Sequence, residues 1–85
     1  MAYSVKLTSH AARQFDGLPP AVKPRIAESL RKLAGDPRPP GCKRLRNRPD
    51  WRLRVGDYRL VYLVDDAARV VSITWIGPRG SAYRG

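Results

Sequence analysis

The chain has 85 residues, the size of one domain, and 42% of them are hydrophobic. Its single cysteine excludes an internal disulfide, and no apolar run approaches the ~20 residues that a membrane-spanning helix needs. Lysine and arginine number 17 against seven aspartates and glutamates, a net charge of +10. We therefore expect one cytoplasmic domain, residues 1–85, with no membrane partner and with a polyanionic partner such as nucleic acid or an acidic protein.

The first 35 residues predict a strand followed by two helices. The segment YSVKLT (residues 3–8) alternates apolar and polar side chains, which is typical of a half-buried strand. A short helix follows, with Ser9 as its expected N-cap and Gly17 as its stop. A second helix ends at Gly35. Its apolar stripe consists of Val22, Ile26, Leu30 and Leu33. Because only a short turn separates the two helices, we expect them to form a hairpin.

The remaining chain predicts a loop and then a meander. Residues 36–50 contain four prolines and five cations without periodicity, which indicates a basic loop. Three strand-like runs follow at 51–55, 58–65 and 69–76. The order β-α-α-β-β-β favours an α+β fold, in which an antiparallel four-stranded sheet carries the N-terminal helical hairpin on one face.

The run WRLRVGDYRLVY (residues 51–62) places arginines close together. If its Gly-Asp turn has two residues, Arg54 lies opposite Arg59, and Arg52 joins them on the same face. The apolar side chains of both strands then share the other face, which takes the helices. Like charges across a strand pair cost about 0.2 to 1 kcal/mol. Either this basic face is solvated, or an anionic ligand offsets the repulsion.

Other cations and aromatic residues extend this basic face. They are Lys43, Arg44, Arg46 and Arg48 from the loop, and Arg79, Tyr83 and Arg84 from the C-terminal GPRGSAYR segment. Aromatic rings and arginine planes are the groups that stack on the bases of single-stranded RNA. The pattern therefore favours nucleic acid or an acidic protein as the ligand, with a solvated cationic face as the alternative.

The available side chains limit any catalysis to arginine, lysine and tyrosine. The chain has one histidine and one cysteine, and it lacks a glycine-rich phosphate loop, so no metal and no cofactor are expected. RNA cleavage is within reach of such a set, because the 2′-OH of the substrate is itself the nucleophile. Arginines would stabilise the phosphorane, and losing one such donor typically costs about 10²- to 10³-fold. Tyr83 would move protons if nearby guanidinium groups lowered its pKa from about 10.

The element order, the RVGDYRLVY segment, the IGPR after the last strand and the closing AYR together resemble the RelE/ParE superfamily of bacterial toxins. Within it, the chain is similar to the RelE branch. This resemblance implies a RelE-like fold and the toxin of a type II toxin-antitoxin system, which cuts mRNA in the ribosomal A site. It also implies an acidic antitoxin, held in a hetero-oligomer, and contacts with mRNA and ribosomal RNA.

The resemblance also assigns roles to individual residues. Arg59 is expected to bind the scissile phosphate, Arg79 to have a related electrostatic role, and Tyr83 to stack on a base and assist proton transfer. Arg52 and Arg54 stand where the best-known branch has two lysines, so Arg54 is expected to stabilise charge and Arg52 to bind RNA. The other residues expected to bind RNA or the ribosome are Lys43, Arg44, Arg46, Arg48 and Arg84.

Two alternatives remain open. A ParE-like inhibitor of DNA gyrase has the same fold but does not need arginines and a tyrosine that face a phosphate. A non-catalytic relative would use the basic face only to bind its antitoxin.

Overall fold

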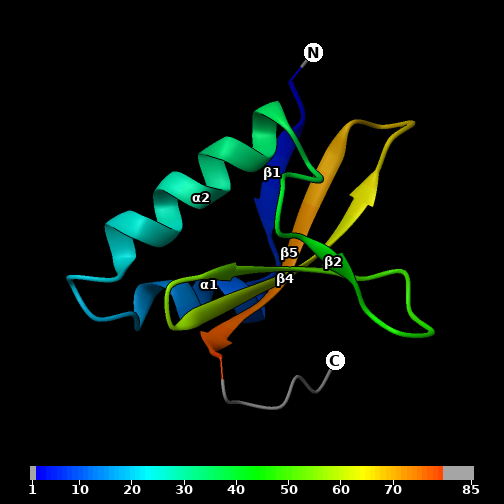
Figure 1. Ribbon diagram of the computed structural model, residues 1–85. Coiled ribbons are helices and arrows are strands. Elements are labelled where there is room, and N and C mark those ends of the chain that lie inside the picture. The colour runs from blue at the N-terminus through cyan, green and yellow to red at the C-terminus, as the bar shows by residue number, and fades with distance from the viewer. Residues whose placement is uncertain (1, 80–85) are drawn as a thin grey trace.

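The computed structural model describes residues 2–79, which form a five-stranded sheet and two helices (Figure 1). The elements are β1 (Ser4–Leu7), α1 (Ser9–Asp16), α2 (Lys23–Gly35), β2 (Lys43–Arg44), β3 (Trp51–Val55), β4 (Tyr58–Asp65) and β5 (Val70–Pro78). Across the sheet the strands follow the order β1-β5-β4-β3-β2. The α+β class and the helical hairpin agree with the prediction.

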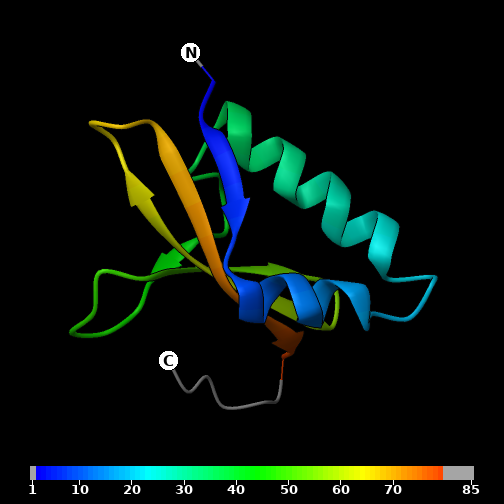
Figure 2. The ribbon, with the colours of Figure 1, turned by 180° about the vertical axis from the view of Figure 1, so that it is seen from behind.

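Two features of the predicted sheet are wrong. Lys43 and Arg44, expected in a loop, form β2 and pair antiparallel with β3, which adds a fifth strand. The sheet is also mixed, because β1 runs parallel to β5 at the opposite edge (Figure 2). A two-residue strand is too short to show periodicity. The direction of β1 relative to a strand more than 60 residues away is not encoded in any local pattern.

The N-cap of helix α1 lies one residue earlier than expected. Thr8 is the N-cap, with an extended backbone and a side-chain oxygen that accepts from the N–H of Ala11 at 3.2 Å. Farther along α1, Gln14 Oε1 accepts from the backbone N–H of Ile76 at 2.7 Å. Since the pairing of β1 with β5 stops at Ile73, this side chain satisfies a strand donor that β1 does not reach.

The main core lies between the helices and one face of the sheet. It consists of Ala11, Ile26, Leu33, Leu60, Tyr62, Val71, Ile73 and Ile76, each at most 2% exposed. Both helices therefore seal the same face, which leaves the other face for the arginines. None of the helices within residues 2–79 is long and apolar enough to cross a membrane.

The register of the β3–β4 hairpin is as predicted. Arg54 pairs with Arg59 and Val55 with Tyr58, across a two-residue turn in which Gly56 has φ +59°. The next pair of strands carries a bulge: Val61 pairs with Trp75 but Tyr62 pairs with Ile73. One residue of β5 is thus left out of the ladder, and the faces of β5 exchange at this point.

The end of the sheet remote from the β3–β4 turn is held by side-chain contacts. Arg38 forms a two-pronged ion pair with Asp66, at 2.8 and 3.1 Å, and Tyr3 donates its hydroxyl to Asp66 Oδ1 at 2.7 Å. The Tyr62 hydroxyl donates to the Pro37 carbonyl at 2.9 Å. Burial raises the pKa of Tyr62, so it remains a neutral donor. These contacts tie the segment after α2 to the sheet.

Candidate active site

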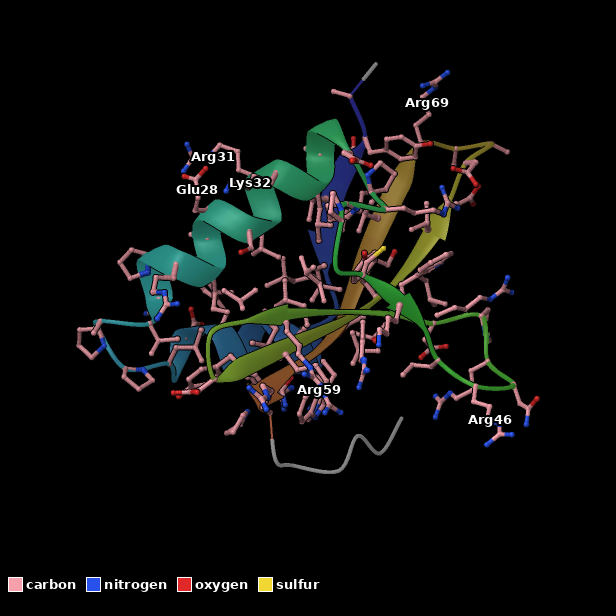
Figure 3. All side chains as sticks on the ribbon, in the orientation of Figure 1. Glu28, Arg31, Lys32, Arg46, Arg59 and Arg69 are labelled. Carbon is pink, nitrogen blue, oxygen red and sulfur yellow. The ribbon has the colours of Figure 1, made fainter. Side chains whose placement is uncertain are left out.

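The β3–β4 hairpin and the end of β5 bring four arginines to the side of the sheet away from α2, where Arg59 is seen in Figure 3. This group, Arg52, Arg54, Arg59 and Arg79, is called the arginine face below. Arg54 lies directly opposite Arg59, and Arg52 lies two residues before Arg54 on the same side of β3. Lys43 pairs with Arg52 and extends the row of cations to the β2 edge.

The backbone of Arg79 is held from two sides. Its N–H donates to the carbonyl of Asp57, in the β3–β4 turn, at 2.7 Å. Its carbonyl accepts from Nη2 of Arg59 at 2.9 Å. The residue that follows β5 is therefore fixed against both the hairpin turn and the middle arginine of the face.

The arginine face carries uncompensated positive charge. Within residues 2–79 the ion pairs are Arg31–Glu28, Arg38–Asp66 and Arg48–Asp50, and none involves this face. Burial is the largest cause that lowers the pKa of Arg59, followed by the charges of its three arginine neighbours. The Nε of Arg59 is buried and has no hydrogen-bond partner among the described residues. Unpaired charge and an unused donor together favour an anionic ligand.

The loop cations are not all part of this face. Arg44 pairs with Trp51, so it lies on the opposite side of the sheet, with its guanidinium 6.0 Å from the centre of the Trp51 ring. Its expected position on the basic face is therefore wrong. Arg46 lies in the loop after β2, far from Arg59 in Figure 3, and Arg48 contacts Asp50 at 3.4 Å. Tyr83 and Arg84 lie outside the described residues.

Two residues beside Arg59 were not predicted as part of the site. Without the bulge, Trp75 would share the face of Val71 and Ile73. The bulge instead turns Trp75 and Gly77 toward the arginine face, with Gly77 directly opposite Arg59. No sequence signal marks this bulge. No cluster of metal-ligating side chains occurs in the described part of the chain.

Comparisons with known proteins identify the family. Residues 5–83 match the model of the ParE toxin of the type II toxin-antitoxin system. The chain is 36% identical to Toxin RelE of Mycobacterium tuberculosis (strain ATCC 25618 / H37Rv), covering 96% of this chain and 87% of the relative. It is 32% identical to a putative RelE-like toxin protein of Escherichia coli, covering 93% and 85% of the two chains.

Solved structures agree with this assignment. The archaeal RelE-RelB complex from Pyrococcus horikoshii OT3 contains a chain that superposes with a TM-score of 0.83 at 31% identity, covering 96% of this chain and 100% of that one. The RelBE2 complex of Mycobacterium tuberculosis also gives a TM-score of 0.83, at 30% identity, covering 93% and 100% of the two chains. The chain therefore belongs to the RelE/ParE superfamily of type II toxin-antitoxin toxins, in its RelE-like branch.

Proposed function

We propose that this toxin is a ribosome-dependent endonuclease that cuts mRNA in the A site and so arrests translation. The observation that carries the proposal is the arginine face, which gathers four guanidinium groups without a carboxylate partner among residues 2–79. A phosphodiester is the ligand that such a face fits, since guanidinium groups bind phosphate oxygens through paired donors. The RelE identity of the relatives favours this function over gyrase inhibition.

The chemistry requires no nucleophile from the protein. The 2′-oxygen of the substrate attacks the adjacent phosphorus, and the bond from phosphorus to the 5′-oxygen breaks, leaving a 2′,3′-cyclic phosphate and a 5′-hydroxyl. One proton leaves the 2′-OH and one is gained by the departing 5′-oxygen. DNA lacks the 2′-OH and would not react by this route.

The side chains have two roles, charge stabilisation by the arginines and proton transfer by the tyrosine. Arg59 would contact the scissile phosphate, with Arg54 and Arg79 stabilising the charge that develops on the phosphorane. Arginine is a poor proton carrier because its pKa exceeds about 12. We therefore assign proton transfer, and stacking on a base, to Tyr83. Arg52 and Lys43 continue the row and would contact neighbouring phosphates.

An acidic antitoxin is the proposed protein partner. The matched structures from Pyrococcus horikoshii and Mycobacterium tuberculosis are complexes of a RelE-type toxin with its antitoxin. The net charge of +10 makes an acidic partner electrostatically favourable for this chain. Such a partner would hold the toxin inactive in a hetero-oligomer.

The test is primer extension on an mRNA bound to programmed ribosomes, with the purified protein, its Arg79→Ala variant and an Arg31→Ala control. Arg31 is an equally charged residue on the exposed side of α2, where it pairs with Glu28 (Figure 3). We expect new 5′ ends inside A-site codons with the native protein and the control, and none with Arg79→Ala. Absence of cleavage by a folded protein that still stops growth and damages DNA would overturn the proposal in favour of gyrase.

A further inference from the structure

The indole of Trp75 occupies the space in which a side chain at position 77 would lie. A Cβ atom built on Gly77 would stand 2.6 Å from Cη2 and 2.7 Å from Cζ2 of Trp75. Real Cβ atoms do not approach ring carbons so closely, so position 77 accepts glycine only while Trp75 keeps this orientation. The two residues therefore form one structural unit.

This unit lies directly beside Arg59. Arg59 pairs with Gly77 across β4 and β5, and Val61 pairs with Trp75. Side chains of directly opposed residues project from the same face about 5 Å apart. Because the indole takes the place of the missing side chain at 77, it is the group that lies across from the Arg59 stem. Trp75 is 8% exposed and Val61 is fully buried, so this part of the face is dry.

We propose that Trp75 is a positioning residue for Arg59: its indole, resting on Gly77, forms the wall that keeps the guanidinium directed toward Arg79. The burial and the hydrogen bonding of Arg59 agree with such a wall. Its Nε is buried while its Nη2 reaches the Arg79 carbonyl at 2.9 Å, so the group is held in one orientation. Burial is also the main cause of its lowered pKa.

The consequence for catalysis rests on the proposed nuclease function. A guanidinium that is already oriented needs no rearrangement when charge develops on the phosphate. An apolar neighbour that excludes water also lowers the local dielectric constant, which strengthens the attraction between the guanidinium and the phosphate. A misplacement of about 1 Å in such a group costs about 10²-fold in rate. The positioning itself is a property of the free toxin, so it is measurable without the ribosome.

The experiment follows the Nε–H signal of Arg59 by nuclear magnetic resonance in the purified toxin and in Trp75→Leu. The signal is assigned by its loss in Arg59→Lys. We expect Trp75→Leu to remove the ring-current shift of this proton and to make its exchange with water on the order of tenfold faster, because a buried group exchanges only when it opens. Trp51→Leu is the matched control, since Trp51 lies on the helix-covered face and contacts Arg38, and it should leave the Arg59 signal unchanged.

A second variant covers the case in which Trp75→Leu does not fold. Gly77→Ala displaces the ring instead of removing it, so it should shift the same signal in the native background. The same substitution in the Trp75→Leu background should have little further effect, because the ring that it displaces is gone. An Arg59 signal that is unchanged in Gly77→Ala, or in a folded Trp75→Leu protein, would overturn the proposal.

Cleavage kinetics separate this inference from the proposed function. With active toxin, Trp75→Leu should lower kcat by about 10²-fold and leave KM within about threefold, as expected for lost positioning. If the Arg59 signal moves but neither the native toxin nor the variant cleaves mRNA, the positioning role holds and the nuclease function fails. An equal loss of kcat in Trp51→Leu would identify a general effect on the fold and would count against the positioning role of Trp75.

Discussion

Among residues 2–79, Arg59 has a buried Nε without a hydrogen-bond partner, three arginine neighbours and no carboxylate in an ion pair with it. Such a position destabilises the folded state, because like charges repel and a buried donor without a partner loses its hydrogen bonds to water. Such costs are tolerated where a ligand removes them. At the scale of single residues, this position is the strongest indication that the face is used for binding an anion.

Replacing Arg59 with lysine tests whether geometry as well as charge matters. Lysine keeps the positive charge but loses the planar fork and the Nη2 hydrogen bond to Arg79. We expect Arg59→Lys to lower single-turnover cleavage on ribosomes by about 10²- to 10³-fold while the melting temperature stays close to that of the native protein. Arg31→Lys, on exposed α2, is the control and should cleave at the native rate. Full activity in Arg59→Lys would show that charge alone suffices.

The lowered pKa of Asp66 predicts that the free energy of unfolding depends on pH in the acidic range. Its hydrogen bonds from Arg38 and Tyr3 hold its pKa at about 2, below the ordinary value of 3.8. Because the pKa in the folded state is depressed, the stabilisation is fully present above about pH 4 and disappears as the pH falls through about 2. Near neutral pH, the free energy of unfolding measured in urea should therefore be higher for the native protein than for Asp66→Asn. The two values should converge near pH 2. The exposed Asp16→Asn serves as control, and a gap that persisted at pH 2 would contradict the assignment.

At the scale of the elements, β4 separates the two faces of the sheet. Leu60 is fully buried against the helices, while Leu63 on the same strand is 37% exposed on the other side. This alternation puts the core and the arginine face on opposite sides of one strand. The strand therefore allows the same substitution to be compared on both faces.

The comparison is Leu60→Ala against Leu63→Ala. Truncating a fully buried leucine loses its transfer free energy and leaves a cavity, so Leu60→Ala should lower the free energy of unfolding by about 2–5 kcal/mol. The exposed Leu63→Ala should change it by no more than about 0.5 kcal/mol. Denaturant unfolding of the two variants measures both values. Similar losses at both positions would mean that the faces of β4 are assigned incorrectly.

At the scale of the whole molecule, the charge is unevenly compensated. The ion pairs found within residues 2–79 lie on α2, at the β4–β5 turn and in the loop before β3, and the arginine face receives none of them. Four arginines without an ion pair among residues 2–79 thus stand together on the side of the sheet opposite the helices. A polyanion would approach this side first.

The salt dependence of RNA binding tests this distribution. Each phosphate contact adds about one to the slope of log affinity against log salt, so Arg52→Ala or Arg54→Ala should lower the slope by about one. Lys32→Ala removes an equal charge from the helix side, where Figure 3 shows it on α2, and should leave the slope unchanged. Affinity titrations of a single-stranded RNA at several salt concentrations measure it. A slope that is unchanged in the arginine variants would exclude this face as the RNA-binding surface.

Much of the hairpin and of the helices was determined by the sequence alone. Apolar alternation and the Gly-Asp turn predicted the register of β3 and β4, and with it the grouping of Arg52, Arg54 and Arg59. The spacing of apolar residues predicted both helices, although Thr8 rather than Ser9 is the cap. These features depend on residues that are close in the chain, so local periodicity and turn chemistry are sufficient to predict them.

Only the tertiary structure decided the rest, because it depends on contacts between distant segments. The pairing of β2 with β3, the parallel approach of β1 to β5 and the bulge opposite Val61 are all set by how the chain closes on itself. The bulge turned Trp75 from the face of Val71 and Ile73 to the side of Arg59, and the pairing of β2 turned Arg44 away from that side. A single residue of shift reverses the face of every side chain beyond it. The sequence alone therefore determined the grouping of Arg52, Arg54 and Arg59, and the tertiary structure decided which other residues lie beside them.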